Sequence, residues 1–473
     1  MVRILSEQAS LFVVFAVLTR LLPPAAFGAI SIAVIFVEVA KLIASNGIAE
    51  AVVQAPDLDE DVADTAFWAN LALSTATAAV IAAVAYPVAA LMKSPELAHI
   101  MLALAIVPII NAAGVVHMAR TTRAFGHKAL AFRSLVANLI GGAVSIVLAL
   151  MGYGLWALVV QRIVAETLLT VASWIALPWR PRLRFVGAKA RQLVGYGFHV
   201  ATTGLIFLLS SRVHEFVVGA TVSLAAVGIL RIGFRLTDLI TQFAVRPFST
   251  VASPTFGRLR EDQARFRAGY HRLQATCAAV AFPAFIGVGA LGTELVPLLF
   301  GEAWRASADI VRVLTLLVVP IVTNYFVTPA LYAKGRPAVA VRIALVQLVL
   351  GTAACLIAAP LGVLWVAIAY VVRAWVTMPY VLWMLRREAD VDVRGTLRAL
   401  AAPLGASLVM GAFVLLFMVA TRGVVAPIPQ VVVGTLIGAL TYPVLLFLLD
   451  RKLVRAAIET ARGMSGRGAK PVA

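Results

Sequence analysis

Residues 19–68 read TRLLPPAAFGAISIAVIFVEVAKLIASNGIAEAVVQAPDLDEDVADTAFW, and this stretch predicts the organisation of the whole chain. An apolar helix ends at Arg20, a Pro-Pro turn follows, and a second apolar helix begins near Phe27. The second helix carries Glu38 and Lys41 within the length that would face hydrocarbon. A charge at mid-membrane costs about 2.5–3.5 kcal/mol on insertion scales, so such residues normally face a protein interior or a watery cavity. The stretch therefore predicts a membrane protein that encloses a polar chamber.

The composition agrees with this prediction. Hydrophobic residues make up 62% of the 473 residues and charged residues 13%, and the mean hydropathy is +0.97. Soluble domains contain about 45–50% apolar and about 25% charged residues. We therefore predict an all-α, polytopic membrane protein. Apolar runs of roughly 20 residues, enough to span a bilayer, suggest about 14 transmembrane helices, near 4–22, 27–47, 66–91, 97–118, 130–151, 154–176, 194–218, 224–246, 273–291, 308–331, 338–358, 362–385, 399–420 and 430–449.

The positive charge follows the predicted topology. With the N-terminus inside, the cytoplasmic segments hold 29 of the 40 Lys and Arg residues, the opposite loops hold 5, and 6 lie within spans. This bias predicts the orientation, with both termini in the cytoplasm. It also accounts for the net charge of +18 through topology and anionic lipid, so we expect no nucleic-acid partner.

Two parts of the chain resemble each other. Val107-Pro108-Ile109 recurs at 319–321, and the ordered residues Gly126, Arg133, Gly142 and Trp156 recur as Gly335, Arg342, Gly351 and Trp365. Upstream, Gly28 corresponds to Gly228. Small residues are abundant and coincide by chance, but the ordered Pro, Gly, Arg and Trp favour a duplication. A unit of six helices is even-numbered, so both copies enter the membrane in the same direction, which predicts a parallel repeat with a site between its halves.

This duplication predicts four regions. Residues 1–192 form an N-lobe of helices 1–6, and residues 193–386 form a C-lobe of helices 7–12. Residues 387–449 hold two additional C-terminal helices, and residues 450–473 form a basic cytoplasmic tail, which we expect to lie on the inner leaflet. The first apolar run is followed by TRLLPP rather than by a small-residue cleavage site, so we interpret it as a retained helix.

Charged residues are concentrated in the helices that the duplication makes equivalent. The seventh helix carries Arg212 and Glu215 at i,i+3, and the eighth carries Arg231 and Arg235 at i,i+4 with Asp238 three residues beyond. Two arginines on one helical face repel unless an anion or a carboxylate lies between them. Guanidinium groups bind phosphate bidentately. We predict a cationic, substrate-binding cavity of Arg20, Lys41, Arg212, Arg231 and Arg235, with Glu38, Glu215 and Asp238 as charge-pairing or proton-coupling residues.

The alternative is that these charges pair within the protein or reach a span end. Glu38 and Lys41 at i,i+3 can pair on one face of the second helix, and Arg162 and Glu166 at i,i+4 are expected to form a structural pair. Asn111 and His117 are expected to make hydrogen bonds between helices. Cys277 and Cys355 lie in apolar spans without metal-ligand spacing, so we predict no disulfide, metal or cofactor.

The sequence gives little support for an enzymatic function. Asp57-Leu58-Asp59 matches the DxD pattern of glycosyltransferases, but it lies in a short acidic loop without a nucleotide-binding domain. The sequence contains no P-loop, HExxH or GxSxG motif. We therefore predict a transporter rather than an enzyme, and one driven by an ion gradient or by the substrate gradient.

The opening motif carries a resemblance to a known family. Arg20-Leu21 through Phe27-Gly28, then Gly47-Ile48, Gln54 and Phe67-Trp68, resemble the opening of Wzx-like polysaccharide and O-antigen flippases. These proteins belong to the polysaccharide transporter family of the multidrug/oligosaccharidyl-lipid/polysaccharide (MOP) exporter superfamily. The later run Tyr332-Ala333-Lys334-Gly335-Arg336 is similar to the second lobe of that family.

The resemblance implies two six-helix lobes around a cationic cavity lined by helices 1, 2, 7 and 8. It also implies a bacterial inner-membrane flippase that moves an undecaprenyl-diphosphate-linked oligosaccharide to the periplasmic leaflet for exopolysaccharide or lipopolysaccharide synthesis. Its partners would be the lipid-linked glycan, membrane lipids, H⁺ or Na⁺ as coupling ion, and a polysaccharide polymerase or glycosyltransferase. The alternatives are a cation-coupled multidrug exporter of the same fold, a peptidoglycan-precursor (lipid II) flippase and, less favoured, a membrane glycan polymerase.

Overall fold

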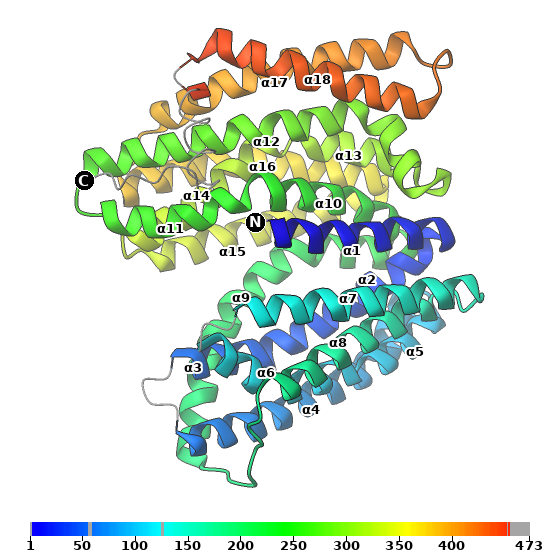
Figure 1. Ribbon diagram of the computed structural model, residues 1–473, viewed down its shortest axis with the longest axis vertical. Helices are drawn as coiled ribbons and strands as arrows, with labels where there is room; N and C mark the ends of the chain where they lie inside the picture. The colour runs from blue at the N-terminus through cyan, green and yellow to red at the C-terminus, as the bar shows by residue number, and fades with distance from the viewer. Residues whose placement is uncertain (1, 55–58, 124–126, 452, 455–473) are drawn as a thin grey trace. The chain divides into compact units, whose positions relative to one another are not determined.

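The computed structural model describes residues 2–54, 59–123, 127–451 and 453–454, and within them all regular structure is helical. The helices are joined by short connections (Figure 1). The chain divides into two compact units, Met1–Arg231 with Cys355–Val363, and Ile232–Ala354 with Leu364–Ala473. The predicted all-α, multi-helix architecture is confirmed. The lobe and tail boundaries remain predictions, and most of the tail lies outside the described residues.

The first unit contains the following elements: α1 (Val2–Leu21), α2 (Pro24–Lys41), the π-helix η1 (Leu42–Asn46), α3 (Gly47–Gln54), α4 (Glu60–Leu91), α5 (Pro95–Leu104), α6 (Ile106–Arg123), α7 (His127–Leu150), α8 (Trp156–Ala176), α9 (Gly187–Thr221) and the first residues of α10 (Leu224–Ala244). Residues 355–363, which include the 3₁₀ turn η3 (Ala359–Leu361), pack against α9.

The second unit contains the rest of α10 followed by α11 (Arg246–Leu259), α12 (Gln263–Phe300), the 3₁₀ turn η2 (Glu302–Trp304), α13 (Ser307–Thr315), α14 (Val318–Ala333), α15 (Pro337–Ala358), α16 (Val363–Ala389), α17 (Val393–Ala420) and α18 (Pro427–Leu449). The helices α17 and α18 form an antiparallel hairpin, and both pack along α12 (Figure 1). The core of this unit is apolar, and the aromatic rings buried in it include Phe256, Phe266, Tyr270 and Phe282.

Among the described residues, eleven helices are long and apolar enough to cross a membrane, or twelve if the bent pair α13–α14, with an angle of 56°, is one span. The predicted number of fourteen is therefore not confirmed. The searched part of α1, Phe12–Leu21, is shorter than a span. The helix α10 is not among the eleven either, and it carries Arg231, Arg235 and Asp238 within 21 residues.

The repeated Val-Pro-Ile sequence has the same local structure in both copies. In the first, the short helix α5 ends at Leu104 and α6 begins at Ile106, which makes Pro108 the third residue of the new helix. In the second, α13 ends at Thr315 and α14 begins at Val318, which makes Pro320 the third residue. A proline is tolerated in the first turn because the N–H that it lacks would have no partner within the helix. This shared break supports the duplication.

The opening motif places α2 against α10. The helix α2 begins at Pro24, three residues before the predicted start, with proline in the favoured first position. Phe27 packs edge-on against Phe15 of α1, with the ring centroids 5.5 Å apart. A Cβ atom at Gly28 would lie 1.7 Å from the carbonyl oxygen of Leu224, so α2 and α10 are in backbone contact at this position. Only glycine permits such a close approach.

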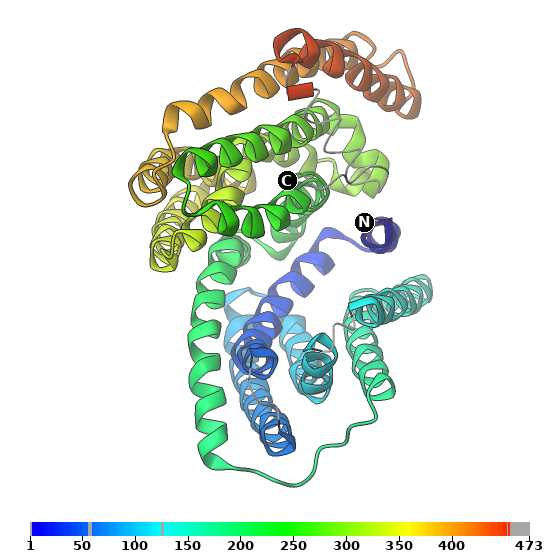
Figure 2. The same cartoon turned by 60° about the vertical axis from the view of Figure 1, so that its left-hand side comes forward.

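The Phe67-Trp68 pair of the motif anchors the extended segment between α8 and α9, which Figure 2 shows passing along the end of the first unit. The Trp68 indole donates to the carbonyl of Arg182 over 2.7 Å, and the buried Asp64 accepts from the Arg182 N–H over 3.0 Å. Phe67 packs edge-on against Trp174 and Trp179. We call residues 177–186 the docked linker.

The DxD-like sequence has a structural role at Asp59, whereas Asp57 and Leu58 lie outside the described residues. Asp59 caps α4 by accepting from the Val62 N–H over 2.7 Å, and it pairs with Lys189 at 2.6 Å. The hydrogen bonds from Lys189 and Val62 lower the pKa of the Asp59 carboxyl. This carboxylate is therefore engaged in holding the start of α4 and of α9.

Candidate functional site

Three helices of the first unit bring four charged side chains into one chain of ion pairs. Glu38 of α2 lies 3.5 Å from Arg212 of α9, Arg212 lies 2.8 Å from Glu215 of α9, and Glu215 lies 3.1 Å from Arg231 of α10. We call these four residues the charge chain. All four are among the residues that the sequence pattern selected for the cavity.

Close backbone packing positions these side chains. Gly47 and Gly197 bring the segment after α2 against α9, because a Cβ atom on Gly47 would lie 2.4 Å from the Gly197 carbonyl oxygen. At the other end, a Cβ atom on Gly228 would lie 2.0 Å from the carbonyl oxygen of Pro24, which holds α10 against α2. Small residues allow membrane helices to approach in this way. The charged residues lie on the stretch of helix between these contacts.

Glu215 is the centre of the charge chain. Its side chain is 1% exposed, and one carboxylate oxygen, Oε1, accepts from both Arg212 and Arg231, whose side chains are 19% and 20% exposed. Two carboxylates and two guanidinium groups make the cluster formally neutral. The buried carboxylate thus compensates two guanidinium groups, which are of the kind that binds anions such as phosphate.

Lys41 belongs to a second cluster. Its ammonium lies 2.9 Å from Glu166 of α8, and Glu166 also accepts from Asn111 of α6 over 2.7 Å. Lys41 therefore pairs with Glu166 rather than with Glu38, and Glu166 pairs with Lys41 rather than with Arg162. The π-helix η1 begins at the residue after Lys41, and π-helical turns are frequent at functional sites. Sequence reasoning placed Asn111 and Glu166 in structural roles and did not connect Glu166 with Lys41.

The remaining predicted residues are Arg20, Arg235 and Asp238. Arg235 and Asp238 follow Arg231 on α10 but belong to the second unit, where Arg235 is half-buried and Asp238 is exposed. Arg20 lies in the last turn of α1 and is exposed. The structure thus brings Glu38, Arg212, Glu215 and Arg231 together, and the roles of Arg20, Lys41, Arg235 and Asp238 in substrate binding remain predictions. Among the described residues, no three His, Cys, Asp or Glu side chains form a group that could hold a metal ion.

Comparison with known families then decides the class of protein. The model of a family described as polysaccharide biosynthesis protein matches residues 17–309, more than half of the chain. The chain belongs to this family. The match includes both the opening motif and the whole charge chain, so the resemblance of residues 19–68 to Wzx-like flippases is confirmed.

Two relatives illustrate this family. The succinoglycan biosynthesis transport protein ExoT of Rhizobium meliloti (strain 1021) is 27% identical over 463 residues, covering 97% of this chain and 93% of that protein. The lipopolysaccharide biosynthesis protein WzxC of Escherichia coli (strain K12) is 20% identical over 310 residues, covering 63% of this chain and 61% of that protein.

Solved structures show the fold. The inward closed conformation of the lipid II flippase MurJ aligns with a TM-score of 0.79 at 13% identity, covering 96% of this chain and 99% of that one. The inward-facing structure of a multidrug resistance MATE family transporter of the MOP superfamily aligns with a TM-score of 0.62 at 16% identity, covering 80% and 95%. The family member therefore has the fold of MOP-superfamily transporters.

Proposed function

We propose that this multi-pass membrane protein is a flippase that moves an undecaprenyl-diphosphate-linked oligosaccharide from the cytoplasmic to the periplasmic leaflet by alternating access. Membership of the polysaccharide biosynthesis family and the transport role in the name of ExoT support this class. The observation that carries the substrate is the charge chain. Arg212 and Arg231, on two different helices, are held by a single buried carboxylate oxygen of Glu215.

A diphosphate would compete with Glu215 for these arginines. The guanidinium groups of Arg212 and Arg231 both donate to Oε1 of Glu215. Each group can instead form bidentate hydrogen bonds with phosphate oxygens. Protonation of Glu215 and Glu38 would release both cations toward the anionic lipid. Both protons would then leave when the lipid leaves and the ion pairs of Glu38 and Glu215 form again. This cycle would couple lipid movement to H⁺, and the oligosaccharide would be carried with the diphosphate.

The location is part of the proposal. The Lys and Arg bias supports both termini in the cytoplasm, and the family resemblance supports a bacterial inner membrane. A lipid-linked glycan would be made on the cytoplasmic side, where nucleotide sugars are available. A polysaccharide polymerase would use the product on the other side. A glycosyltransferase would supply the substrate.

A multidrug exporter of the same fold is the second candidate, favoured by the resemblance to the MATE transporter. Cationic drugs would need free carboxylates, whereas Glu38 and Glu215 are both engaged by arginine. Binding of a spin-labelled polyprenyl diphosphate sugar to the purified chain separates these functions. We expect saturable binding that inorganic diphosphate weakens and a lipophilic cation does not. Binding of the cation in place of the diphosphate lipid would refute the proposal.

A further inference from the structure

A basic hollow of about 870 Å³ lies in the second unit where α16 ends and α17 begins. Four arginines and two aspartates line it, from α12, α16, α17 and the α16–α17 connection, namely Arg267, Arg386, Asp390, Asp392, Arg394 and Arg398. It belongs to the Arg-rich side of the chain, which the charge bias assigns to the cytoplasm. We call it the basic hollow.

The two acidic residues of the basic hollow are already engaged. Asp390 pairs with Arg267, which also donates to the Asp390 carbonyl. Asp392 caps α17 by accepting from the Gly395 N–H, and it lies 3.6 Å from His271. In the described part of the chain, the other three arginines, Arg386, Arg394 and Arg398, make no ion pair with these carboxylates or with any other. The hollow therefore presents three uncompensated cations.

These cations converge on one place. Arg394 and Arg398 are one helical turn apart on α17, a spacing at which like charges repel unless an anion lies between them. Arg386 joins them from the end of α16. Nearby on α16, Trp383 is 49% exposed and Arg387 lies over its ring at 5.4 Å. Exposed tryptophan of this kind is typical of the membrane–water boundary, which places the basic hollow at the level of lipid headgroups.

An apolar groove leads away from the basic hollow along α17. A hollow of about 370 Å³ shares Leu397 and Ala401 with the basic hollow and is otherwise lined by apolar side chains of α14, α16 and α17. This apolar hollow also shares Trp375 and Leu404 with a larger cavity, of about 700 Å³, between α12, α13, α16 and α17.

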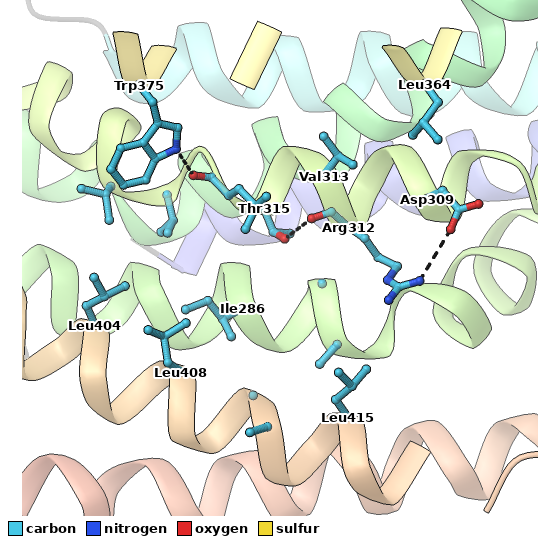
Figure 3. Close-up of a pocket in the computed structure, with 17 residues that line it drawn as sticks. Ile286, Asp309, Arg312, Val313, Thr315, Leu364, Trp375, Leu404, Leu408 and Leu415 are labelled. Carbon is cyan, nitrogen blue, oxygen red and sulfur yellow. Dashed lines mark hydrogen bonds and ion pairs between the residues drawn. The ribbon is translucent and has the colours of Figure 1, made fainter. Parts of the chain in front are cut away.

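Figure 3 shows this last cavity, with Leu404, Leu408 and Leu415 of α17 facing Ile286 of α12 and Trp375 of α16. The Trp375 indole is held by the carbonyl of Leu316 at 3.0 Å, so its ring forms a fixed wall of the groove. The Asp309–Arg312 pair closes the far end. The basic hollow is thus continuous with an apolar groove that runs along a membrane helix.

We propose that this surface binds an anionic glycerophospholipid, with its phosphate on Arg386, Arg394 and Arg398 and an acyl chain in the groove along α17. Juxtamembrane arginines attract anionic lipids, and charge-assisted bonds to phosphate are the strong ones. The bound lipid is a resident of the second unit and not the transported substrate. It neutralises the repulsion between Arg394 and Arg398 and ties the α17–α18 hairpin to α16.

Native mass spectrometry of the full chain, with phosphatidylglycerol or phosphatidylcholine added at equal concentration, tests this proposal. The Arg394→Gln/Arg398→Gln variant is compared with Arg258→Gln/Arg272→Gln, which removes the same charge from exposed positions of the same unit. We expect the wild type and the control to retain phosphatidylglycerol about tenfold better than phosphatidylcholine. The first variant should lose this preference, because it lacks two of the three arginines that would hold the phosphate. Equal retention of both lipids by the wild type, or an unchanged preference in the first variant, would overturn the proposal.

The groove is tested with the arginines intact. Ala401→Trp fills the passage between the basic hollow and the groove, whereas Ala439→Trp adds the same ring to an exposed position of α18. We expect only Ala401→Trp to release phosphatidylglycerol. Glycerol phosphate, which has no acyl chain, should not displace phosphatidylglycerol. If it displaces the lipid as well as a second phospholipid does, only the headgroup is bound, and the proposed acyl-chain groove is wrong. Displacement of phosphatidylglycerol by a polyprenyl diphosphate, abolished by the same variants, would show that the groove holds substrate and would refute a resident phospholipid.

Discussion

Gly28 and Gly228 occupy equivalent positions of the duplicated sequence and lie against each other, with a Cβ atom on Gly28 falling 3.2 Å from the Gly228 nitrogen. Each also approaches a backbone carbonyl on the partner helix, at Leu224 and at Pro24. The contact is therefore reciprocal. It sets the separation of α2 and α10, and with it the reach of Arg231 toward Glu215.

Replacement of either glycine by alanine should separate these helices. The atoms nearest to each added methyl group are backbone atoms, which cannot rotate away, so we expect a cost of about 1–3 kcal/mol for each variant, typical of overpacking. Thermal unfolding in detergent measures this cost. Gly257→Ala, at an exposed helical glycine with no neighbour within 4 Å, is the control. An unfolding temperature that is unchanged in both Gly28→Ala and Gly228→Ala would contradict the close contact.

Glu215→Gln should destabilise the protein and make its stability dependent on anions. Removal of one partner from a buried ion pair costs about 3–5 kcal/mol, because the remaining charge is left uncompensated. Inorganic diphosphate should therefore raise the unfolding temperature of Glu215→Gln more than that of the wild type. Glu96→Gln, in the exposed first turn of α5, controls for the loss of one carboxylate. Equal stabilisation of all three proteins by diphosphate would argue against a pairing role for Glu215.

Lys41 and Glu166 should show strong coupling in a double-mutant cycle. Lys41→Met leaves the 8% exposed carboxylate of Glu166 with Asn111 as its hydrogen-bond partner, and Glu166→Gln leaves the ammonium unpaired. We expect the double variant to be less destabilised than the sum of the two single variants. The difference, the coupling free energy, should be about 0.5–3 kcal/mol. Additive effects in chemical unfolding would mean that the 2.9 Å pair contributes nothing to stability.

Asp64→Ala should release the docked linker. The buried carboxylate of Asp64 accepts from the Arg182 N–H, and loss of a hydrogen bond to a charged group costs about 1.5–3 kcal/mol. Each 1.4 kcal/mol is a factor of ten, so trypsin should cleave after Arg182 and Arg184 roughly ten- to a hundredfold faster. Asp61→Asn, which removes the exposed pair with Arg184, is the matched control and should change cleavage little.

Much of the fold could be predicted from the sequence, because hydrocarbon restricts which structures can span a membrane. The apolar runs predicted most helices, and the i,i+3 spacing of Arg212 and Glu215 gave a pair that the structure contains. The number of spans was less certain, since α10 carries three charges and α13–α14 is bent at a break. Hydropathy alone does not resolve such elements.

The partners of the intramembrane charges could not be predicted in the same way. Lys41 is 125 residues from Glu166, and Glu38 is 174 residues from Arg212. Local spacing favoured Glu38 for Lys41 and Arg162 for Glu166, but the structure pairs Lys41 with Glu166 of α8 and Glu38 with Arg212 of α9. A signal was present in Glu166 itself, an acidic residue within an apolar span, because such a residue requires a partner in the protein interior.

The most direct test of the proposed function is a leaflet-exchange assay in proteoliposomes with a fluorescent polyprenyl-diphosphate oligosaccharide, read by quenching of the outer leaflet. We expect exchange by the wild type that is faster with a proton gradient. We expect exchange to be lost in Arg212→Gln/Arg231→Gln and in Arg235→Ala at normal expression and folding. The Arg258→Gln/Arg272→Gln protein should exchange lipid like the wild type. Undiminished exchange by the Arg212→Gln/Arg231→Gln protein would contradict the claim that these arginines hold the diphosphate.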